Sequence, residues 1–397
     1  MGGGCLNTIS TFVGSDLVPL RRRGVWQGIG NLVFGAGMGL GGVFGGAMHD
    51  TIGWRWAFYL QVPFIVLAGI AAYFSIDVPI KETDDPRISR VDFLGAATLS
   101  ATLILLLLGL NSGGNIVPWS HPLVTVSLPL SLVFLLLFIY VEDRVASEPV
   151  IPVRLLLNRT VAAACATNWF ITMSIFALLY YGPIYFQVVL SLSAQEAGYR
   201  LIPQSAGTAL GSLGAGLIMR KTGRYWWLNI LAQIMSITAA ALILATFGKD
   251  VQTAPPFIYL FLTGTAYGCT LTVTLLALIA SVDHKYQAVA TSASYAFRST
   301  GSSIGITIAG TVFSNLLKLG LSNRFAGYPG AEDEIGRIRD SVDEITRLPK
   351  GWHGGVIAAY VDALRGVWVV VLGFATLAAI VSFTMREQVL YKNLERT

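Results

Sequence analysis

The fold is decided by residues 93–141, which read FLGAATLSATLILLLLGLNSGGNIVPWSHPLVTVSLPLSLVFLLLFIYV and contain no Asp, Glu, Lys or Arg. A helix rises about 1.5 Å per residue, so about 20 apolar residues cross the hydrocarbon core of a bilayer, which is about 30 Å thick. The run is too long for one such helix, and Asn-Ser-Gly-Gly-Asn at 111–115 and Pro118 interrupt it. It therefore predicts two membrane-spanning helices joined by a turn.

Uncharged runs of similar length occur on both sides of this segment. Together with residues 286–316, which we interpret as one helix containing Arg298, they predict ten full spans. Residues 1–14 are uncharged but too short, and are interpreted as the end of a further span. The expected fold is therefore an all-α polytopic membrane protein. The other runs are 24–49, 56–76, 160–195, 201–219, 225–248, 251–282 and 366–385.

The composition agrees with this interpretation and excludes other classes. The chain is 54% hydrophobic and 12% charged, with a mean hydropathy of +0.64. A soluble domain carries about 25% charged residues, so an ordinary water-soluble enzyme is excluded. The spacing of Cys5, Cys165 and Cys269 fits neither a metal site nor a disulfide framework, and there is no His-Glu-x-x-His motif. We expect no enzymatic activity, no metal and no cofactor.

Basic residues are distributed unequally between the loops, which predicts the orientation. The alternate short loops hold only Arg55, Arg200 and Lys249. The other loops and the C-terminal tail hold 16 basic residues, so this side and the C-terminus are expected in the cytosol. The net charge of +5 is then explained by topology, and nucleic acid is not an expected partner. These 16 are Arg21, Arg22, Arg23, Lys81, Arg87, Arg90, Arg144, Arg154, Arg159, Arg220, Lys221, Arg224, Lys285, Arg386, Lys392 and Arg396.

One long loop, at 317–363, is predicted on the non-cytosolic side. Its apolar residues recur at spacings of three and four, which indicates a short amphipathic helix lying on the membrane or on the protein. The alternative is a solvated lid without a specific role. The apolar residues are Ile335, Ile338, Val342, Ile345 and Leu348.

Two charged loops carry recognisable motifs. Asp16-Leu-Val-Pro19-Leu-Arg-Arg-Arg23-Gly24 places an acid and a base where they can pair across a loop. Gly216-Leu-Ile-Met-Arg220-Lys221-Thr-Gly223-Arg224 combines glycines that permit a tight turn with cations at a helix end. Both resemble loop motifs of the major facilitator superfamily, the second being its Gly-x3-Asp-Arg-x-Gly-Arg signature with Arg220 in place of Asp. The resemblance implies that these residues form cytosolic gate contacts.

A glycine-rich helix follows the first motif. Small residues at four-residue spacing let helices pack closely in lipid, which assigns packing roles to Gly37, Gly41, Gly45 and Gly46. The stretch resembles the antiporter signature of the superfamily's fifth helix. It lacks the proline that normally precedes the final glycines, and Gly42 and Val43 stand there.

Residues 54–63, Trp-Arg-Trp-Ala-Phe-Tyr-Leu-Gln-Val-Pro, and 180–187, Tyr-Tyr-Gly-Pro-Ile-Tyr-Phe-Gln, are similar to the fungal drug:H⁺ antiporter-2 branch, which has fourteen spans. The Gln-Val-Pro form favours its vacuolar basic amino-acid transporters. This resemblance implies an N-terminally truncated chain without the first three helices. The expected organisation is a remnant of the N-terminal half at 1–76, a cytosolic loop at 77–92, linker helices at 93–141, a cytosolic loop at 142–159, a six-helix half at 160–386 and a cytosolic tail at 387–397.

The resemblance implies a secondary transporter working by alternating access between two halves, with its substrate near the bilayer midplane. Ionisable groups at that depth are costly and usually functional, which singles out Arg298. The alternative is that the Arg298 side chain snorkels to the cytosolic interface. Polar and aromatic residues of the first helix of the six-helix half are further candidates for the substrate pathway. They are Asn168, Trp169, Tyr180, Tyr181 and Gln187.

The expected partners are the lipid bilayer and a small-molecule substrate, either a basic amino acid or an amphiphilic drug exchanged for protons. A chain that does not transport is the alternative. No Asp or Glu lies inside a complete predicted helix, so three possibilities for protons stay open. The carboxylate lies in the absent helices, Asp16 and Asp50 serve, or transport is not proton-coupled. Oligomeric state and the choice between vacuolar and plasma membrane also stay open.

Overall fold

The apolar runs form long helices in the computed structural model, which describes residues 20–75, 92–114, 116–146, 153–248, 255–282, 286–328, 331–340 and 351–387. No strand occurs among these residues, and the all-α prediction is confirmed. Ten described helices have 20 residues or more: α2 (Leu20–Thr51), α3 (Trp54–Ser75), α4 (Phe93–Ser112), α5 (Pro122–Arg144), α7 (Arg159–Ile184), α9 (Ile202–Thr222), α10 (Trp226–Thr246), α11 (Pro255–Ser281), α12 (Gln287–Phe325) and α14 (His353–Ser382). Shorter elements are α6 (Val153–Leu156), η2 (Tyr185–Val189), α8 (Ala194–Tyr199) and α13 (Ala331–Asp340).

Nine described helices are long and apolar enough to cross a membrane. The tenth long helix, α9, has 21 residues but is rich in glycine and hydroxyl side chains and ends in Arg220 and Lys221. In the structure α9 lies between α2 and α11, so its polar residues are covered by other helices rather than by lipid.

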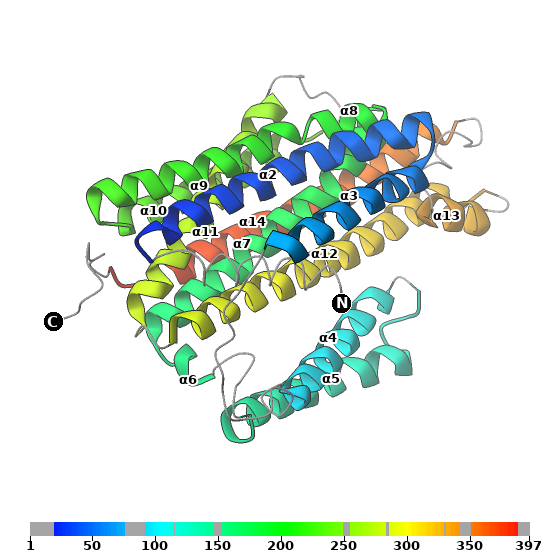
Figure 1. Cartoon of the computed structure of the whole chain (residues 1–397). Helices are drawn as coiled ribbons and strands as arrows, with labels where there is room; N and C mark the ends of the chain where they lie inside the picture. The colour runs from blue at the N-terminus through cyan, green and yellow to red at the C-terminus, as the bar shows by residue number, and fades with distance from the viewer. Residues whose placement is uncertain are drawn as a thin grey trace.

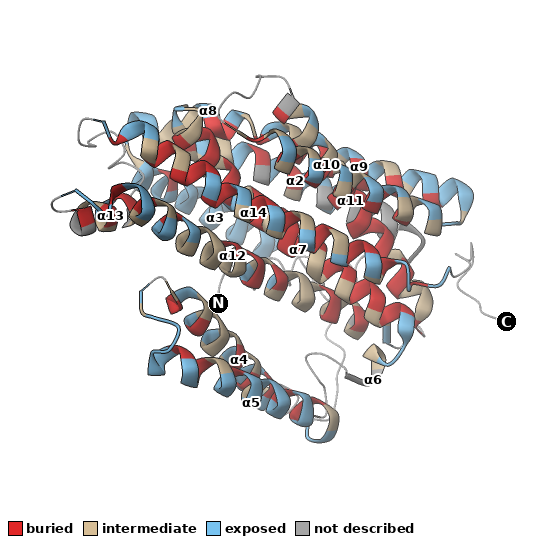
Figure 2. Cartoon of the chain, turned by 180° about the vertical axis from the view of Figure 1, so that it is seen from behind, coloured by how far each residue is buried: buried red, intermediate tan, exposed pale blue. Residues whose placement is uncertain are grey.

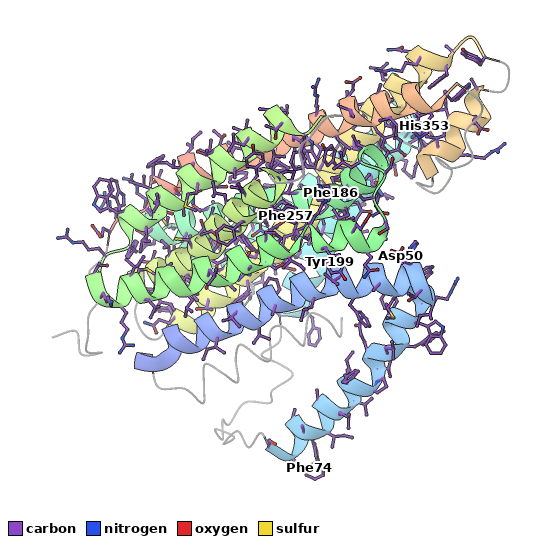
Figure 3. All side chains as sticks on the ribbon, turned by 90° about the horizontal axis from the view of Figure 1, so that it is seen from above. Asp50, Phe74, Phe186, Tyr199, Phe257 and His353 are labelled. Atoms are coloured by element: carbon purple, nitrogen blue, oxygen red, sulfur yellow. The ribbon has the colours of Figure 1, made fainter. Side chains whose placement is uncertain are left out.

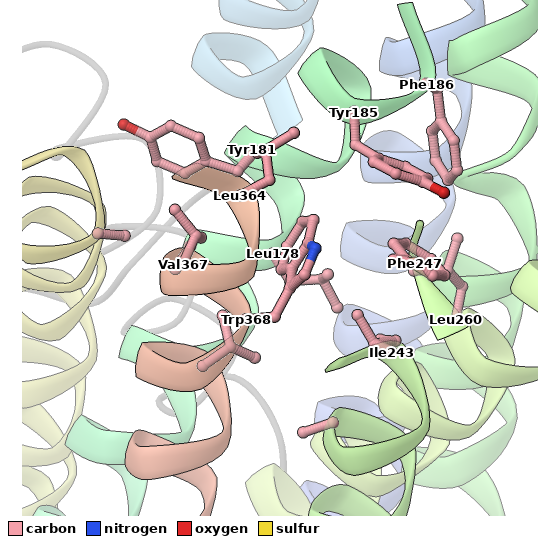
Figure 4. Packing of buried hydrophobic residues seen from close by; sticks show 14 of the residues in the cluster. Leu178, Tyr181, Tyr185, Phe186, Ile243, Phe247, Leu260, Leu364, Val367 and Trp368 are labelled. Carbon is pink, nitrogen blue, oxygen red and sulfur yellow. The ribbon is translucent and has the colours of Figure 1, made fainter. Parts of the chain in front are cut away.

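The six helices α7, α9, α10, α11, α12 and α14 form one bundle around α7 and α11 (Figure 1). In both α7 and α11, 72% of the most apolar window is buried (Figure 2). An aromatic cluster closes one end of the core, where the ring of Tyr185 stacks on that of Phe247 at 4.6 Å and Trp368 meets both rings edge-on (Figure 4). This bundle is called the C-terminal half below.

Helix α2 packs along α8 and α9, and α3 packs on α2. Figure 3 shows α3 running away from the bundle, from the turn near Asp50 to Phe74. Ala57 is the one residue of α3 that is buried in the described chain. The α4–α5 hairpin lies separately beside α12 (Figure 1).

The two ends of the bundle differ in charge. The loops at one end are joined by hydrogen bonds from Arg159 Nε to Thr384 O at 2.9 Å and from Tyr225 Oη to Arg386 O at 2.7 Å. This end carries Arg159, Arg220, Lys221, Arg224 and Arg386 and is called the basic end below. Helices α8 and α13 lie at the opposite end (Figure 1).

The predicted limits of the loop at 317–363 are both wrong, and the predicted loop is too long at each end. Helix α12 continues to Phe325, and α14 already begins at His353. The prediction ends the helices at charged residues, whereas Arg324 and Asp362 lie inside helices and pair with each other at 2.6 Å. Asp362 is therefore an acidic residue within a helix, as are Asp50 in α2 and the buried Glu142 in α5, contrary to the prediction that none would be found there.

The predicted amphipathic helix is present as α13 and lies on the protein. Ile335 and Ile338 are buried in a cluster with Phe325 and Trp352, whose rings stack at 4.0 Å. Tyr360 Oη donates a hydrogen bond of 3.0 Å to Ile338 O. Because the apolar face of α13 is buried against α12 and α14, the helix caps the opposite end of the bundle. The other three residues of the pattern, Val342, Ile345 and Leu348, lie outside the described residues.

Candidate functional site

The loop after α9 has the geometry that its motif predicts. Gly223 ends the helix in the left-handed region, with φ of +68°, and its N–H bonds to Met219 O at 2.8 Å. The exposed cations Arg220 and Lys221 lie in the last turn, where the helix dipole favours positive charge. Gly216 has Thr272 Cγ2 at 4.0 Å from its virtual Cβ, so this glycine is not required by close contact.

The other charged loop is only partly visible. Asp16 and Pro19 lie outside the described residues. Arg23 and Gly24 belong to the first turn of α2, but the side chain of Arg23 is not described. The proposed pair between Asp16 and Arg23 therefore stays a prediction.

The glycine face of α2 differs in register from the predicted one. Virtual Cβ atoms at Gly37, Gly41 and Gly45 meet nothing within 4 Å. At Gly46 a Cβ would lie 2.5 Å from Ala194 O. The residues that face α8 and α9 are Gly35, Gly39, Gly42 and Gly46. Their spacings of four, three and four follow the helix period more closely than a strict spacing of four, which explains the correction.

Beyond this face, the end of α2 is tied to α8. The Asp50 carboxylate accepts a hydrogen bond of 3.0 Å from Gln195 N and lies 3.0 Å from His49 Nδ1. Gly198 of α8 approaches Gly42 of α2 so closely that a Cβ on Gly198 would overlap the carbonyl of Gly42. This contact joins the N-terminal helices to the C-terminal half at the end opposite to the basic end.

A cavity of about 310 Å³ lies beside this contact, between α2 and the end of α7. Gln187, a predicted pathway residue, lines it from the π-helix η2. π-Helical turns are rare and often occur at functional sites. The other lining residues are Gly42, Gly45, Gly46, His49, Trp54, Pro183, Ala194, Gly198 and Leu201.

Asn168 is fully engaged inside the C-terminal half. Its Nδ2 donates to Ser294 Oγ at 2.9 Å, and its Oδ1 accepts from Thr274 Oγ1 at 3.0 Å. All three residues are buried, so the amide joins α7, α11 and α12. Its geometry supports a role in helix packing rather than direct exposure to a substrate.

Trp169 and Arg298 lie at similar depths on neighbouring helices. Trp169 is ten residues from the start of α7 and Arg298 eleven from the start of α12, which is about 15 Å from the basic end along each helix. The guanidinium of Arg298 lies 5.0 Å from the centre of the Tyr295 ring. Arg298 Nε is buried and has no hydrogen-bond partner in the described part of the chain.

The two tyrosines differ in environment. Tyr181 is 5% exposed and its ring packs against Phe313 at 5.2 Å, so it contributes to the core. Tyr180 is 55% exposed. The structure therefore packs Asn168 and Trp169 of α7 against Ser294 and Gly301 of α12, and separates Gln187 from them by about five turns of helix. The contacts of Asp50 were missed, because the sequence does not show which backbone N–H faces a carboxylate.

A polytopic helical protein with a partly buried cation inside a long apolar helix and a glycine-packed contact between its N-terminal and C-terminal helices has features expected of a secondary transporter. The family model described as Major Facilitator Superfamily matches residues 1–306. The chain belongs to this superfamily and is a multi-pass integral membrane protein.

Curated relatives from fungi are similar over most of the chain. It is 36% identical to "Multidrug resistance protein fnx1" of Schizosaccharomyces pombe, over 100% of this chain and 76% of that protein. It is 32% identical to "Vacuolar membrane amino acid uptake transporter fnx2" of the same organism, over 92% of this chain and 63% of the relative. It is also 32% identical to "Vacuolar basic amino acid transporter 2" of Saccharomyces cerevisiae, over 81% of this chain and 71% of the relative.

A solved structure supports the fold. A bacterial homologue of the human lysosomal transporter Spinster, in an inward-facing and occupied conformation, superposes with a TM-score of 0.57 at 18% identity. The match covers 94% of this chain and 72% of the bacterial protein. At this identity the likeness concerns the fold alone.

Proposed function

We propose that this superfamily member transports basic amino acids across the vacuolar membrane in exchange for protons, by alternating access. Two relatives are named as vacuolar amino acid transporters, one of them for basic amino acids. Their names supply the proposed substrate class and membrane, and the contacts of the chain supply the proposed mechanism.

The observation that carries this proposal is the position of Arg298. A buried guanidinium nitrogen without a partner is costly inside a long apolar helix, so a bound anion would stabilise it. Every amino acid has a carboxylate, which a guanidinium binds well. Arg298 is thus assigned to the substrate carboxylate. The ring of Trp169 at the same depth is available to a cationic substrate side chain.

Alternating access requires a contact between the halves that closes one side and then separates. The contact of α2 with α8 fits this role because it combines glycine backbone packing with exposed hydrogen bonds at Asp50, among them the one from Gln195 N. Water at the surface replaces that bond when the helices separate.

The distribution of cations supports an orientation with the basic end in the cytosol. The C-terminal segment follows α14 at that end and is then cytosolic as well. The gate motif at Arg220, Lys221 and Arg224 would close the cytosolic side.

Uptake into proteoliposomes tests the proposal. We expect an acidic interior to drive accumulation of labelled arginine, and Arg298→Gln to abolish it. Arg298→Lys keeps the charge but loses the planar fork, so partial uptake is expected. Normal uptake by Arg298→Gln at equal abundance would contradict the assignment. No uptake by the native chain would instead favour a chain that does not transport by itself.

Multidrug efflux is a second candidate, because the relative with 36% identity is named a multidrug resistance protein. An amphiphilic cation without a carboxylate has no group for Arg298 to bind. We therefore expect such a cation to compete poorly with arginine. Transport of the cation that is unaffected by Arg298→Gln would favour the efflux function.

A further inference from the structure

The end of α4 is completed by side chains of α12. Leu110 O accepts a hydrogen bond of 2.8 Å from Thr311 Oγ1, and Gly113 O accepts one of 3.3 Å from Asn315 Nδ2. The last carbonyls of a helix have no partner inside it, and an unpaired carbonyl is costly in lipid. Separation of α4 from α12 would therefore leave both carbonyls unsatisfied.

The turn after α4 fits closely around Asn315. Gly114 has φ of +72°, and a Cβ there would overlap Asn315 Oδ1. The ring of Trp119 covers Gly113, at 2.7 Å from the position of its virtual Cβ. The two glycines are thus needed where the α12 amide and the Trp119 ring approach the backbone.

Apolar contacts continue along the rest of the hairpin. Leu103, Leu106 and Leu107 of α4 belong to the same cluster as Ile304 and Ile308 of α12. Further toward the basic end, Phe138 of α5 packs in a cluster with Ala293. From Ala293 to Asn315 the contact extends about 33 Å along α12, which is the depth of a hydrocarbon core.

We propose that the α4–α5 hairpin is a fixed part of the C-terminal half, which stays on α12 throughout transport while α2 separates from α8. This inference rests on the proposed alternating access. The two contacts differ in kind. The α4 contact combines two part-buried hydrogen bonds to carbonyls with an apolar face of full membrane depth, whereas the α2 contact with α8 is held by glycine packing and the exposed Asp50 hydrogen bond.

Paired cysteines test which contact moves. Leu110→Cys with Thr311→Cys joins α4 to α12, and His49→Cys with Ala194→Cys, at two residues that line the same cavity, joins α2 to α8. Each pair is cross-linked in proteoliposomes with a short bifunctional thiol reagent. The four single-cysteine chains are the matched controls for linkage to the native cysteines.

We expect the first cross-link to form in high yield with and without a pH gradient and with saturating arginine. Arginine uptake should be retained after this linkage. The second cross-link should block uptake, with recovery when a cleavable reagent is reduced. A first cross-link that is absent, changes several-fold with the gradient, or blocks uptake reversibly would overturn the inference.

The cross-linking yield is read on a gel, so it tests the α4 contact even if arginine is not transported. In that case the proposed function fails, and a high constant yield still supports the fixed hairpin.

Substitutions provide a second test. Asn315→Leu should lower the yield of the Leu110–Thr311 pair several-fold. Thr307→Val should not, because Thr307 Oγ1 bonds only to Ser303 O within α12.

Discussion

Asp50 at the end of α2 accepts a hydrogen bond from the backbone N–H of Gln195 in the first turn of α8, with 3.0 Å between Oδ2 and N. The two residues are 145 positions apart and belong to different parts of the transporter. The bond joins the N-terminal helices to the C-terminal half beside the 310 Å³ cavity. Its position at the surface lets it break without leaving a buried group unpaired.

Asp50→Ala is expected to loosen this contact, because Gln195 N loses its acceptor. The measurement is the labelling rate of a cysteine placed at Gln187 in the adjacent cavity wall, which should rise several-fold. Asp50→Asn keeps an acceptor oxygen and should raise the labelling rate less. Equal rates in native and Asp50→Ala chains would show that the hydrogen bond does not hold the contact closed.

Gly46→Leu should destabilise the protein, since a side chain there meets the backbone of Ala194 and Gln195. Overpacking of this kind costs roughly 1–3 kcal/mol. Gly37→Leu is the matched control, because Gly37 has open space and lies on the same helix. Thermal unfolding in detergent should therefore show a lower midpoint for the first variant only. A lower midpoint for Gly37→Leu than for Gly46→Leu would instead support the glycine face predicted from the sequence.

The sequence was sufficient for features other than the two contacts just described. Uncharged length predicted the long helices, and the Gly216–Arg224 motif predicted a turn whose Gly223 has positive φ. Both depend on properties of single residues or short segments. The face of a glycine-rich helix depends on rotation about its axis, and glycines in α2 are frequent enough to satisfy several rotations.

The helix ends were predicted less well, because a charge does not end a helix that extends beyond the membrane. Arg324 and Asp362 pair there, at a place that sequence assigned to a loop. Asn168 illustrates the same limit for the site. Its residue type suggested a polar lining, whereas its hydrogen bonds to Ser294 and Thr274 could be known only from the packing of three helices.

Asn168→Ala is expected to lower the free energy of unfolding by roughly 1–3 kcal/mol, because its loss leaves buried hydroxyl groups with fewer partners. Ser294→Ala removes the other side of the 2.9 Å bond. The double variant should then cost less than the sum of the single ones. Denaturation of the purified native chain, the two single variants and the double variant measures the free energy of unfolding of each. Additive costs would mean that the pair is not coupled.

Replacement of Arg220, Lys221 and Arg224 together by Ala should reduce arginine uptake several-fold without reducing the amount of protein in the membrane. The cations are exposed at the end of α9, so their loss affects the gate rather than the core. Uptake is compared after normalisation to protein abundance. The matched control is Arg144→Ala, a cation at the end of α5 that pairs with Asp143. Unchanged uptake by the triple variant would contradict a gate role.

The pair of Arg324 with Asp362 should stabilise the cap at the opposite end only slightly, despite its distance of 2.6 Å. The side chains are 33% and 54% exposed, and exposed pairs contribute about 0.2–1 kcal/mol after screening by water and salt. Arg324 Nη1 also donates to Gly320 O at 2.9 Å, so Arg324→Gln removes more than the ion pair. Asp362→Asn is the cleaner variant, and its small loss of stability should shrink further at high salt. The double variant Arg324→Asp with Asp362→Arg exchanges the two charges and should recover part of the lost stability. A decrease of several kcal/mol for Asp362→Asn that salt does not change would show that the pair acts as a buried one.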